Sequence, residues 1–292
     1  MTGLPGGCVM CGSLYLRFNG QLPCWDHVGE GHVLRSVTRE ELESASGESL
    51  VAFPALLHIR SSFAAGLLPY PDDCRRCAMR GHLGDHVCAS PATLRVLHVE
   101  PSFSCRLSCP LCIPAPERKR RMPPPHNLDP SLFEAFLRRL RADGVSAVRY
   151  LLFEGRGDPL MNPAVGRMVA AAKDAFPGVL TNVVSHGSYE WQPWLVSCGL
   201  DILTLSVDGA RPGSYGRYRV GGDLEEVLAL MRRACGEGAR ARPPLRVVWR
   251  YILFEWNDGD DELAEAGALA ASFGAEIRFL RTHSDGRSRR FP

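Results

Sequence analysis

From about residue 93 onward, short apolar runs alternate with stretches in which apolar residues recur at helical spacing. Six of the apolar runs have the length of a strand: 94–99, 148–153, 178–184, 202–207, 245–254 and 276–280. Strands that alternate with helices are typical of βα units arranged around a parallel sheet. The sequence therefore predicts an α/β fold for residues 93–292.

The helices between these strands have recognisable starts and stops. Asp129 and Asn162 each place a capping side chain directly before a proline, and proline is favoured at the first helical position. Gly144 and Gly178 fit the ends of these two helices. Further helices are expected at 188–198, 223–235 and 260–273.

Residues 1–92 have a different pattern. They contain short β-like pieces such as SLYLRFNG, scattered glycines and six cysteines, without an alternation of strands and helices. We therefore predict two parts, a cysteine-rich module at 1–92 and the α/β domain at 93–292. The stretch 113–127 is basic and proline-rich, so it cannot be a helix interior. We interpret it as a solvated connection, with a lid over the substrate as the alternative.

Composition and charge exclude several classes of protein. The 292 residues are 45% hydrophobic and 23% charged, which argues against a disordered or fibrous chain. A formal net charge of +2 is too small to indicate a nucleic-acid partner. The apolar runs are too short to cross a membrane, and the N-terminus lacks the pattern of a signal peptide. We expect a cytoplasmic protein.

The eleven cysteines change this picture, because nine of them are grouped. In a reducing compartment, grouped cysteines usually bind metal or take part in catalysis. Cys105, Cys109 and Cys112 form a Cys-x3-Cys-x2-Cys run directly after the predicted strand 94–99. Three thiolates on one loop can bind three irons of a four-iron cluster and leave the fourth iron open. A structural zinc site is the alternative, although zinc needs a fourth ligand.

With this triplet the sequence resembles the radical S-adenosylmethionine superfamily, in which the same spacing follows the first strand of a partial (β/α)6 barrel. Four later segments are similar to motifs of that family in the same order: 151–163, 183–187, 205–209 and 248–258. The resemblance implies a partial (β/α)6 TIM-like barrel at 93–292. It also implies a [4Fe-4S] cluster on the three cysteines, with S-adenosylmethionine on the fourth iron.

Within these segments the resemblance implies contacts to S-adenosylmethionine. Asp158 stands where the family has a glutamate, which keeps the charge but shortens its reach. Arg250 is the candidate partner of the S-adenosylmethionine carboxylate. The complete set of implied cofactor-binding residues is Leu111, Gly155, Gly157, Asp158, Ser185, Ser206, Asp208 and Arg250.

The cysteines of the first 92 residues resemble a second kind of site. Their order is similar to that of SPASM and twitch modules, which hold auxiliary iron-sulfur clusters, although the module here precedes the barrel. The candidate ligands are Cys8, Cys11, Cys24, Cys74, Cys77 and Cys88. Four of them would hold one auxiliary [4Fe-4S] cluster. Zinc is the alternative, because two pairs are spaced as in a zinc knuckle, and His82 or His86 could then contribute.

The resemblance implies a radical enzyme of the oxidoreductase type, in which a 5′-deoxyadenosyl radical abstracts hydrogen from the substrate. We expect oxidation or crosslinking of a peptide or of a sugar-like small molecule, with an electron donor such as flavodoxin or ferredoxin. Epimerisation with Cys198 or Cys235 as the hydrogen donor is one alternative. A non-catalytic zinc or iron-sulfur protein is the alternative from a different class. No residue in the sequence identifies the substrate.

Overall fold

The computed structural model describes residues 12–24, 32–77, 94–112, 126–282 and 285–291. Among them, no helix combines the length and the apolarity that a membrane crossing requires. The chain divides into two compact units. Unit 1 consists of residues 1–100, 128–152 and 171–179, and unit 2 of residues 101–127, 153–170 and 180–292. Unit 1 thus combines the N-terminal residues with two later segments.

Seven of the described strands form one sheet in the order β1-β4-β5-β6-β7-β8-β9. Six of them match the strands expected from the apolar runs: β4 (Val96–Val99), β5 (Tyr150–Phe153), β6 (Leu180–Ser185), β7 (Ile202–Ser206), β8 (Arg246–Leu253) and β9 (Glu276–Arg281). The pairs β1–β4, β6–β7, β7–β8 and β8–β9 are parallel. Because β1 and β9 end the order, the described sheet is open. The α/β fold class with a partial-barrel sheet is confirmed.

The seventh strand, β1 (Ser13–Leu16), is an addition that the sequence analysis did not place in this sheet. It pairs in parallel with β4, with Ser13 opposite Val96 and Leu16 opposite Val99. All four of its residues are buried. Its short apolar run lies among glycines and cysteines, and strand preference depends on the neighbours that a strand meets in the fold. The local pattern therefore did not show which sheet it joins.

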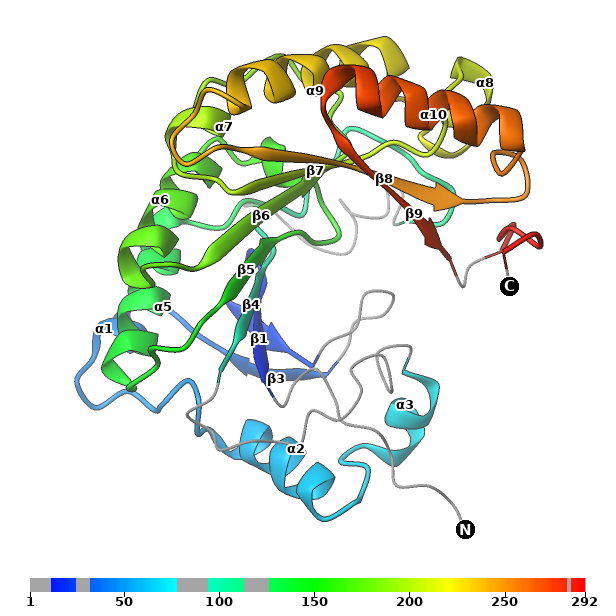
Figure 1. Cartoon of the computed structure of the whole chain (residues 1–292). Coiled ribbons are helices and arrows are strands. Elements are labelled where there is room, and N and C mark those ends of the chain that lie inside the picture. Colours follow the sequence, from blue (N-terminus) through cyan, green and yellow to red (C-terminus); the bar gives the residue numbers. More distant parts are fainter. Residues whose placement is uncertain (1–11, 25–31, 78–93, 113–125, 283–284, 292) are drawn as a thin grey trace. The chain divides into compact units, whose positions relative to one another are not determined.

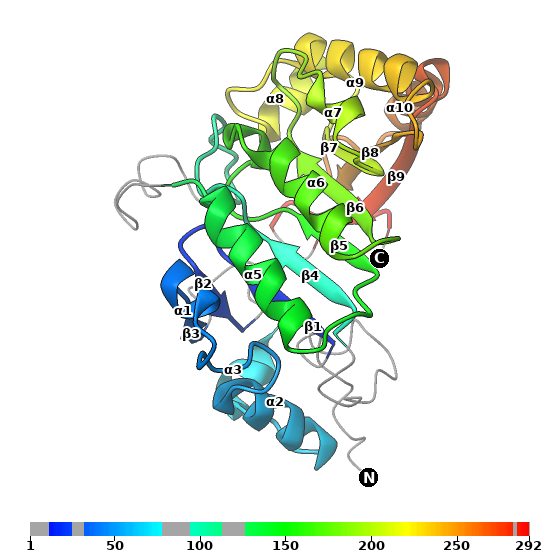
Figure 2. The same ribbon diagram turned by 90° about the vertical axis from the view of Figure 1, so that its left-hand side faces the viewer.

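Unit 1 also contains a hairpin and several helices. In the hairpin, β2 (Gln21–Pro23) pairs antiparallel with β3 (Val33–Ser36). The helices are α1 (Arg39–Glu43), α2 (Pro54–Ala64), α3 (Pro71–Arg76) and α5 (Pro130–Ala142). Helix α1 packs against α5 (Figure 2), where Arg138 donates to the Glu43 carboxylate at 2.8 Å.

The helix starts predicted at Asp129 and Asp223 are confirmed, and the helix after Asn162 begins two residues later than predicted, at Val165 and not Pro163. Asp129 caps α5 by accepting from the Ser131 backbone N–H at 2.8 Å. Asn162 accepts from the Ala164 N–H at 2.9 Å, just before α6 (Val165–Ala175). Asp223 caps α9 (Leu224–Gly238), and α10 (Asp260–Phe273) spans the residues that the sequence predicts.

In unit 2, α9 and α10 lie on the same side of β7, β8 and β9 (Figure 1). The face of α9 that is buried consists of apolar residues at helical spacing: Leu224, Val227, Leu230, Met231 and Ala234. Strand residues Leu203, Leu205 and Trp249 are fully buried as well. This apolar layer fixes the strands, so the loops at their carboxyl ends have a rigid support.

The helix expected at 188–198 is wrong for most of its length. Only α7 (Trp194–Ser197) is helical there, and α8 (Pro212–Tyr218) is a helix that the sequence analysis did not predict. The Ser188 N–H donates to Nδ1 of His186 at 3.1 Å, and its carbonyl accepts from Arg106 at 3.1 Å. Because side chains satisfy this backbone, it does not continue into a helix.

Candidate active site

The three cysteines of the Cys-x3-Cys-x2-Cys run lie on a loop that follows β4 in the chain. Cys109 is buried, Cys105 is half-buried and Cys112 is exposed. A turn brings the Cys112 N–H to the Cys109 carbonyl at 3.0 Å. The Leu107 N–H points to Sγ of Cys105 at 3.4 Å, and Leu111 is exposed on the same loop. The three thiols of this loop therefore differ in solvent exposure, from the buried Cys109 to the exposed Cys112.

Two other loops of unit 2 brace this cysteine loop. The Ser108 N–H donates to the carbonyl of Val220 at 2.9 Å. Gly221 follows with a φ of +88°, a conformation that L side chains rarely adopt. In addition, the Arg106 side chain donates to the Ser188 carbonyl. The cysteine loop is thus held by contacts to two other loops.

The Gly155–Asp158 segment after β5 packs directly on the start of the cysteine loop. A Cβ added at Gly157 would lie 2.2 Å from the Ser102 carbonyl oxygen, so only glycine fits there. The next N–H, of Asp158, donates to the Ser104 carbonyl at 2.7 Å. Gly155 is half-buried. The structure therefore places this predicted motif against the predicted cluster loop.

The carboxylate of Asp158 joins two predicted motifs. It is buried and caps the short 3₁₀ helix η2 (Pro159–Met161) by accepting from the Leu160 N–H at 2.9 Å. It also accepts from Oγ of Ser185, at 2.9 and 3.0 Å to its two oxygens, and from the His186 N–H at 2.9 Å. The structure thus brings together Asp158 and Ser185, which belong to two different predicted motifs. Both oxygens of the Asp158 carboxylate accept hydrogen bonds from protein donors.

Asp208 connects the end of β7 to the cysteine loop through an arginine. The Asp208 side chain is fully buried, and it accepts from the Ile252 N–H at 2.6 Å. Its other oxygen accepts from Nε and Nη2 of Arg219 at 2.7 and 2.6 Å. The Arg219 guanidinium is also close enough to the Cys109 thiol to lower its pKa. Asp208 therefore holds a buried cation against a candidate metal ligand.

The charges of these groups depend on one another. Although burial opposes its charge, the Asp208 carboxylate and the Cys109 sulfur raise the pKa of Arg219 above its usual value. Burial raises the pKa of the Cys109 thiol, while Arg219 opposes that rise. A metal ion replaces the thiol proton when it binds. Arg219 is thus placed to stabilise the thiolate form that a metal requires.

Arg250 has protein partners in this structure. Its Nη1 donates to the Glu154 carboxylate at 2.6 Å, and its Nε donates to Oγ of Ser206 at 3.0 Å. Arg250 and Ser206 are register partners on β8 and β7. Both side chains of the Arg250–Glu154 pair remain partly exposed. Of the predicted residues, Arg250 and Ser206 are therefore brought together, with Glu154 as a partner that the sequence did not indicate.

Two buried tyrosines complete the surroundings of the loop. Burial, together with the nearby Asp158 carboxylate and Cys105 sulfur, raises the pKa of Tyr189. Burial also raises the pKa of Tyr215, whose OH lies 3.3 Å from Oγ of Ser188. Both phenols therefore stay neutral near pH 7. The sequence analysis missed these tyrosines and Arg219, although the segment YGRYR at 215–219 concentrates arginine and tyrosine just before a predicted helix.

The donor set of the loop fits an iron-sulfur cluster. In the part of the chain that the structure describes, no three His, Cys, Asp or Glu side chains are arranged around the position of a single metal ion. The thiolates of a four-iron cluster bind three different irons, so they need not converge on one point. The N–H aimed at Cys105 and the cation beside Cys109 both favour sulfur that carries negative charge.

Only some of the predicted auxiliary ligands can be placed. Cys8, Cys11 and Cys88, together with His82 and His86, lie outside the described residues. In unit 1, Cys24 follows β2 and its N–H donates to the His32 carbonyl at 2.7 Å. Cys24 and Cys74 are both close enough to Tyr70 to contribute to its raised pKa, after burial as the main cause. Cys77 is half-buried at the end of α3.

No known family model matches the chain, and no curated protein matches its sequence. Solved structures with a similar fold include methylornithine synthase (PylB), at 16% identity and a TM-score of 0.47, with 86% of this chain and 66% of that chain covered. The protein anSMEcpe with bound AdoMet matches at 12% identity and a TM-score of 0.49, covering 66% of this chain and 56% of its own.

A third similar structure is TsrM from Kitasatospora setae, a radical S-adenosylmethionine methyltransferase with tryptophan and a SAM analogue bound. It matches at 12% identity and a TM-score of 0.43, covering 64% of this chain and 36% of its own. All three are radical S-adenosylmethionine enzymes. This chain matches between 36% and 66% of their lengths. The likeness to them is one of fold.

Proposed function

We propose that this chain is a radical S-adenosylmethionine enzyme that binds its cluster through Cys105, Cys109 and Cys112. The observation that carries the proposal is the Cys-x3-Cys-x2-Cys loop next to the buried Arg219–Asp208 pair. A buried cation reduces the cost of bringing thiolate charge into the protein. When bound, the cluster supplies one electron to S-adenosylmethionine, whose carbon–sulfur bond breaks to give methionine and a 5′-deoxyadenosyl radical.

The residues around the loop would bind and orient S-adenosylmethionine. Because the Asp158 oxygens already accept from three protein groups, we assign Asp158 to holding the 155–158 backbone in place for the methionyl amine. Arg250 has five N–H donors, of which Glu154 and Ser206 take two. Its other donors can bind the methionyl carboxylate. We place the remaining motif residues in the same site: Leu111, Gly155, Gly157, Ser185, Ser206 and Asp208.

The buried groups would also protect the reaction. A primary carbon radical reacts with any hydrogen donor nearby, so the site must exclude water and hold its own side chains still. Tyr189 stacks on His186 with ring centroids 4.7 Å apart. The Arg106 guanidinium lies over the Tyr189 ring, 5.4 Å from its centroid. These contacts fix the aromatic side chains next to the cysteine loop.

For the net reaction we propose oxidation or crosslinking of a peptide or sugar-like substrate, assisted by an auxiliary [4Fe-4S] cluster in residues 1–92. The shared proximity of Cys24 and Cys74 to Tyr70 supports a common site for cysteines that are far apart in the sequence. An auxiliary cluster is most useful when an electron must leave the substrate radical. The donor for the first electron would be a flavodoxin or ferredoxin, in a cytoplasmic setting.

The first test is anaerobic reconstitution with iron and sulfide, followed by reduction with dithionite in the presence of S-adenosylmethionine. The enzyme should release 5′-deoxyadenosine, and the triple variant C105A/C109A/C112A should release none. The matched control is C198A, which removes an isolated cysteine at the end of α7. Release of 5′-deoxyadenosine by the triple variant would show that the cluster assignment is wrong.

The second test separates oxidation from epimerisation. Turnover of candidate peptide and sugar-like substrates is run in deuterated water, and the product is weighed. A loss of about two mass units, from two hydrogens, supports oxidation or crosslinking. A gain of one deuterium without other change would instead support an epimerase with a cysteine donor, either Cys198 or Cys235.

A further inference from the structure

The last described residues of the chain fold back on the segment that follows β8. The Glu255 N–H donates to the Gly286 carbonyl at 2.9 Å, and the Ser288 N–H donates to the Leu253 carbonyl at 3.3 Å. Phe254 and Arg287 form an antiparallel bridge. The sequence analysis did not assign a function to this arginine-rich stretch. In the structure, residues 285–291 form a wall of unit 2.

Side chains fix this wall in place. Ser288 is buried and donates to the Asp258 carboxylate at 2.5 Å. Arg290 forms an ion pair with Asp260 at 2.6 Å and also donates to the Asp258 carbonyl. Gly286 has a φ of +73°, and a Cβ added there would lie 2.6 Å from the ring of Trp256. The tail is therefore closely fitted to the loop after β8.

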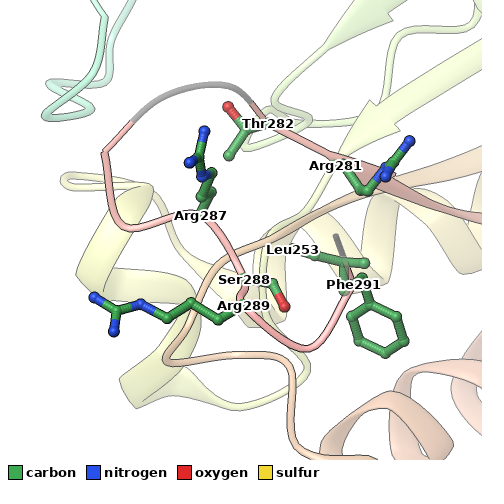
Figure 3. Close-up of a pocket in the computed structure, with 7 residues that line it drawn as sticks. All are labelled: Leu253, Arg281, Thr282, Arg287, Ser288, Arg289 and Phe291. Carbon is green, nitrogen blue, oxygen red and sulfur yellow. The ribbon is translucent and has the colours of Figure 1, made fainter.

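A pocket of about 460 Å³ lies between this wall and the ends of β8 and β9. Its lining consists of Leu253, Arg281, Thr282, Arg287, Ser288, Arg289 and Phe291 (Figure 3). The volume falls within the range of small-molecule sites. Leu253 and Arg281 are the last residues of their strands and register partners. The pocket thus sits at the carboxyl ends of parallel strands, where barrel proteins bind their ligands.

The charge of the pocket is unbalanced. Across the described residues, no carboxylate lies within ion-pair distance of Arg281, Arg287 or Arg289. Other arginines of the same elements do have such partners, because Arg278 pairs with Glu276 at 2.6 Å and Arg290 pairs with Asp260. The pocket lining therefore carries three positive charges that no described carboxylate balances. An anionic ligand would balance that charge.

We propose that this pocket binds a phosphate-bearing small molecule. Phosphate carries more charge than one carboxylate and offers three acceptor oxygens, which suits several arginines at once. In Figure 3 the three guanidinium groups spread around the pocket and do not meet at one point. We therefore expect a diphosphate to fit better than a single phosphate. Leu253 and Phe291 both line the pocket and would contact the apolar part of the ligand. This inference goes beyond the proposed function and does not depend on it.

The test uses calorimetric titration of the full-length chain with pyrophosphate, inorganic phosphate and succinate at one fixed ionic strength. We expect pyrophosphate to bind at a single site more tightly than phosphate, and succinate to bind weakest. The variant R281Q/R287Q should lose affinity for pyrophosphate by about tenfold for each guanidinium removed. The matched control R278Q, which changes the same charge three residues earlier on β9, should change the affinity by less than about twofold.

The single variants R281Q, R287Q and R289Q keep the test decisive if the double variant unfolds, because each affected side chain is exposed. Equal affinity for pyrophosphate in these variants and in the unchanged chain would overturn the proposal. Succinate binding as tight as that of pyrophosphate would also overturn it, because charge alone would then explain the pocket. The titration needs neither iron nor S-adenosylmethionine, so its failure is distinguishable from failure of the radical mechanism.

Discussion

The cysteines of the 105–112 loop and those of the N-terminal region lie in contrasting surroundings. The loop is held by backbone hydrogen bonds from neighbouring loops, and its Cys109 lies next to a fully buried carboxylate and its arginine. In unit 1, Asp73 precedes Cys74 and pairs with His32 at 2.7 Å, and both of these side chains are about half exposed. The backbone N–H groups of Cys24 and Cys74 donate to the carbonyls of His32 and Tyr70, both at 2.7 Å.

The difference between the surroundings of the two groups of cysteines indicates how each site would form. The 105–112 loop is shaped by the fold of unit 2, so its thiols are placed before any metal binds. The described N-terminal cysteines lie beside half-exposed charged side chains, so we expect a bound metal to supply part of the free energy that orders them. We therefore expect the two regions to respond differently when cysteines, charges or glycines are changed.

We expect the largest effect from cysteine variants, because cysteines of the two regions would serve different functions. The variant C109A should abolish release of 5′-deoxyadenosine, whereas C74A/C77A should keep it while losing one cluster. Two four-iron clusters correspond to about eight irons per chain, and C74A/C77A should retain about four. Iron analysis and a 5′-deoxyadenosine assay on the reconstituted proteins measure both. If C74A/C77A keeps all its iron, or contains zinc instead, the N-terminal assignment is wrong.

The next effect concerns the buried ion pair behind the cysteine loop. The variant D208N keeps the shape of the side chain but leaves the Arg219 charge buried without its carboxylate. Breaking a buried pair in this way should lower the free energy of unfolding by about 3–5 kcal/mol. Urea unfolding of the iron-free chain measures this difference. The matched control is D261N, because Asp261 pairs with Arg211 at 2.9 Å on an exposed surface.

For D261N we expect no measurable change in the urea midpoint, because exposed ion pairs contribute little. Equal midpoints for D208N and the unchanged chain would contradict the view that the fold itself prepares the loop. Reduced iron uptake by D208N after reconstitution would support that view, since Arg219 would no longer be held against Cys109.

Much of the fold and the core of the site could be predicted from the sequence. The six strands and the capped helices follow from local periodicity and from residues such as Asp129, whose capping role is local. The cysteine triplet is recognisable because its ligands lie within eight residues. Asp158 and Ser185 come from motifs in a fixed order. In each case the decisive information lies within a short segment.

The missed features depend on contacts between distant segments. Arg219 gains its role only because the chain brings it to Asp208 and Cys109, more than one hundred residues from the latter. The pairing of β1 with β4 spans more than eighty residues. The expected helix at 188–198 failed because Arg106 and His186 satisfy the backbone of Ser188. None of these partners is visible in the local pattern.

A smaller effect is expected from the close approach of the Gly155–Asp158 segment to the cysteine loop. In G157A the new methyl group would clash with the Ser102 carbonyl at 2.2 Å, which should lower the free energy of unfolding by about 1–3 kcal/mol. The matched control is G236A in α9, where a Cβ meets no atom within 4 Å. Alanine should stabilise that helix by about 0.5–1 kcal/mol.

Urea unfolding measures both glycine variants, and iron content after reconstitution gives a second readout. We expect G157A to take up less iron than G236A, because the cysteine loop must shift to admit the methyl group. Full iron uptake together with unchanged stability in G157A would mean that the two segments need not touch, and the bracing described above would then be incidental.

The smallest effect distinguishes a packing cysteine from a metal ligand. Burial within α9 raises the pKa of Cys235 to about 11, so the thiol form is favoured in the folded chain. The stabilising contribution of the neutral Cys235 thiol is complete below pH 9, declines between about pH 9 and 11, and is lost above that range.

Iodoacetamide reacts with the thiolate form of cysteine. At pH 8, in the iron-free folded chain, we expect the exposed Cys112 to be alkylated at least about tenfold faster than Cys235. Peptide mass spectrometry measures both rates, and chain unfolded in urea serves as the control in which they should be equal. Alkylation of Cys235 at the rate of Cys112 in the folded chain would remove the reason to treat it as a packing residue, and would favour its role as a reactive donor in the epimerase alternative.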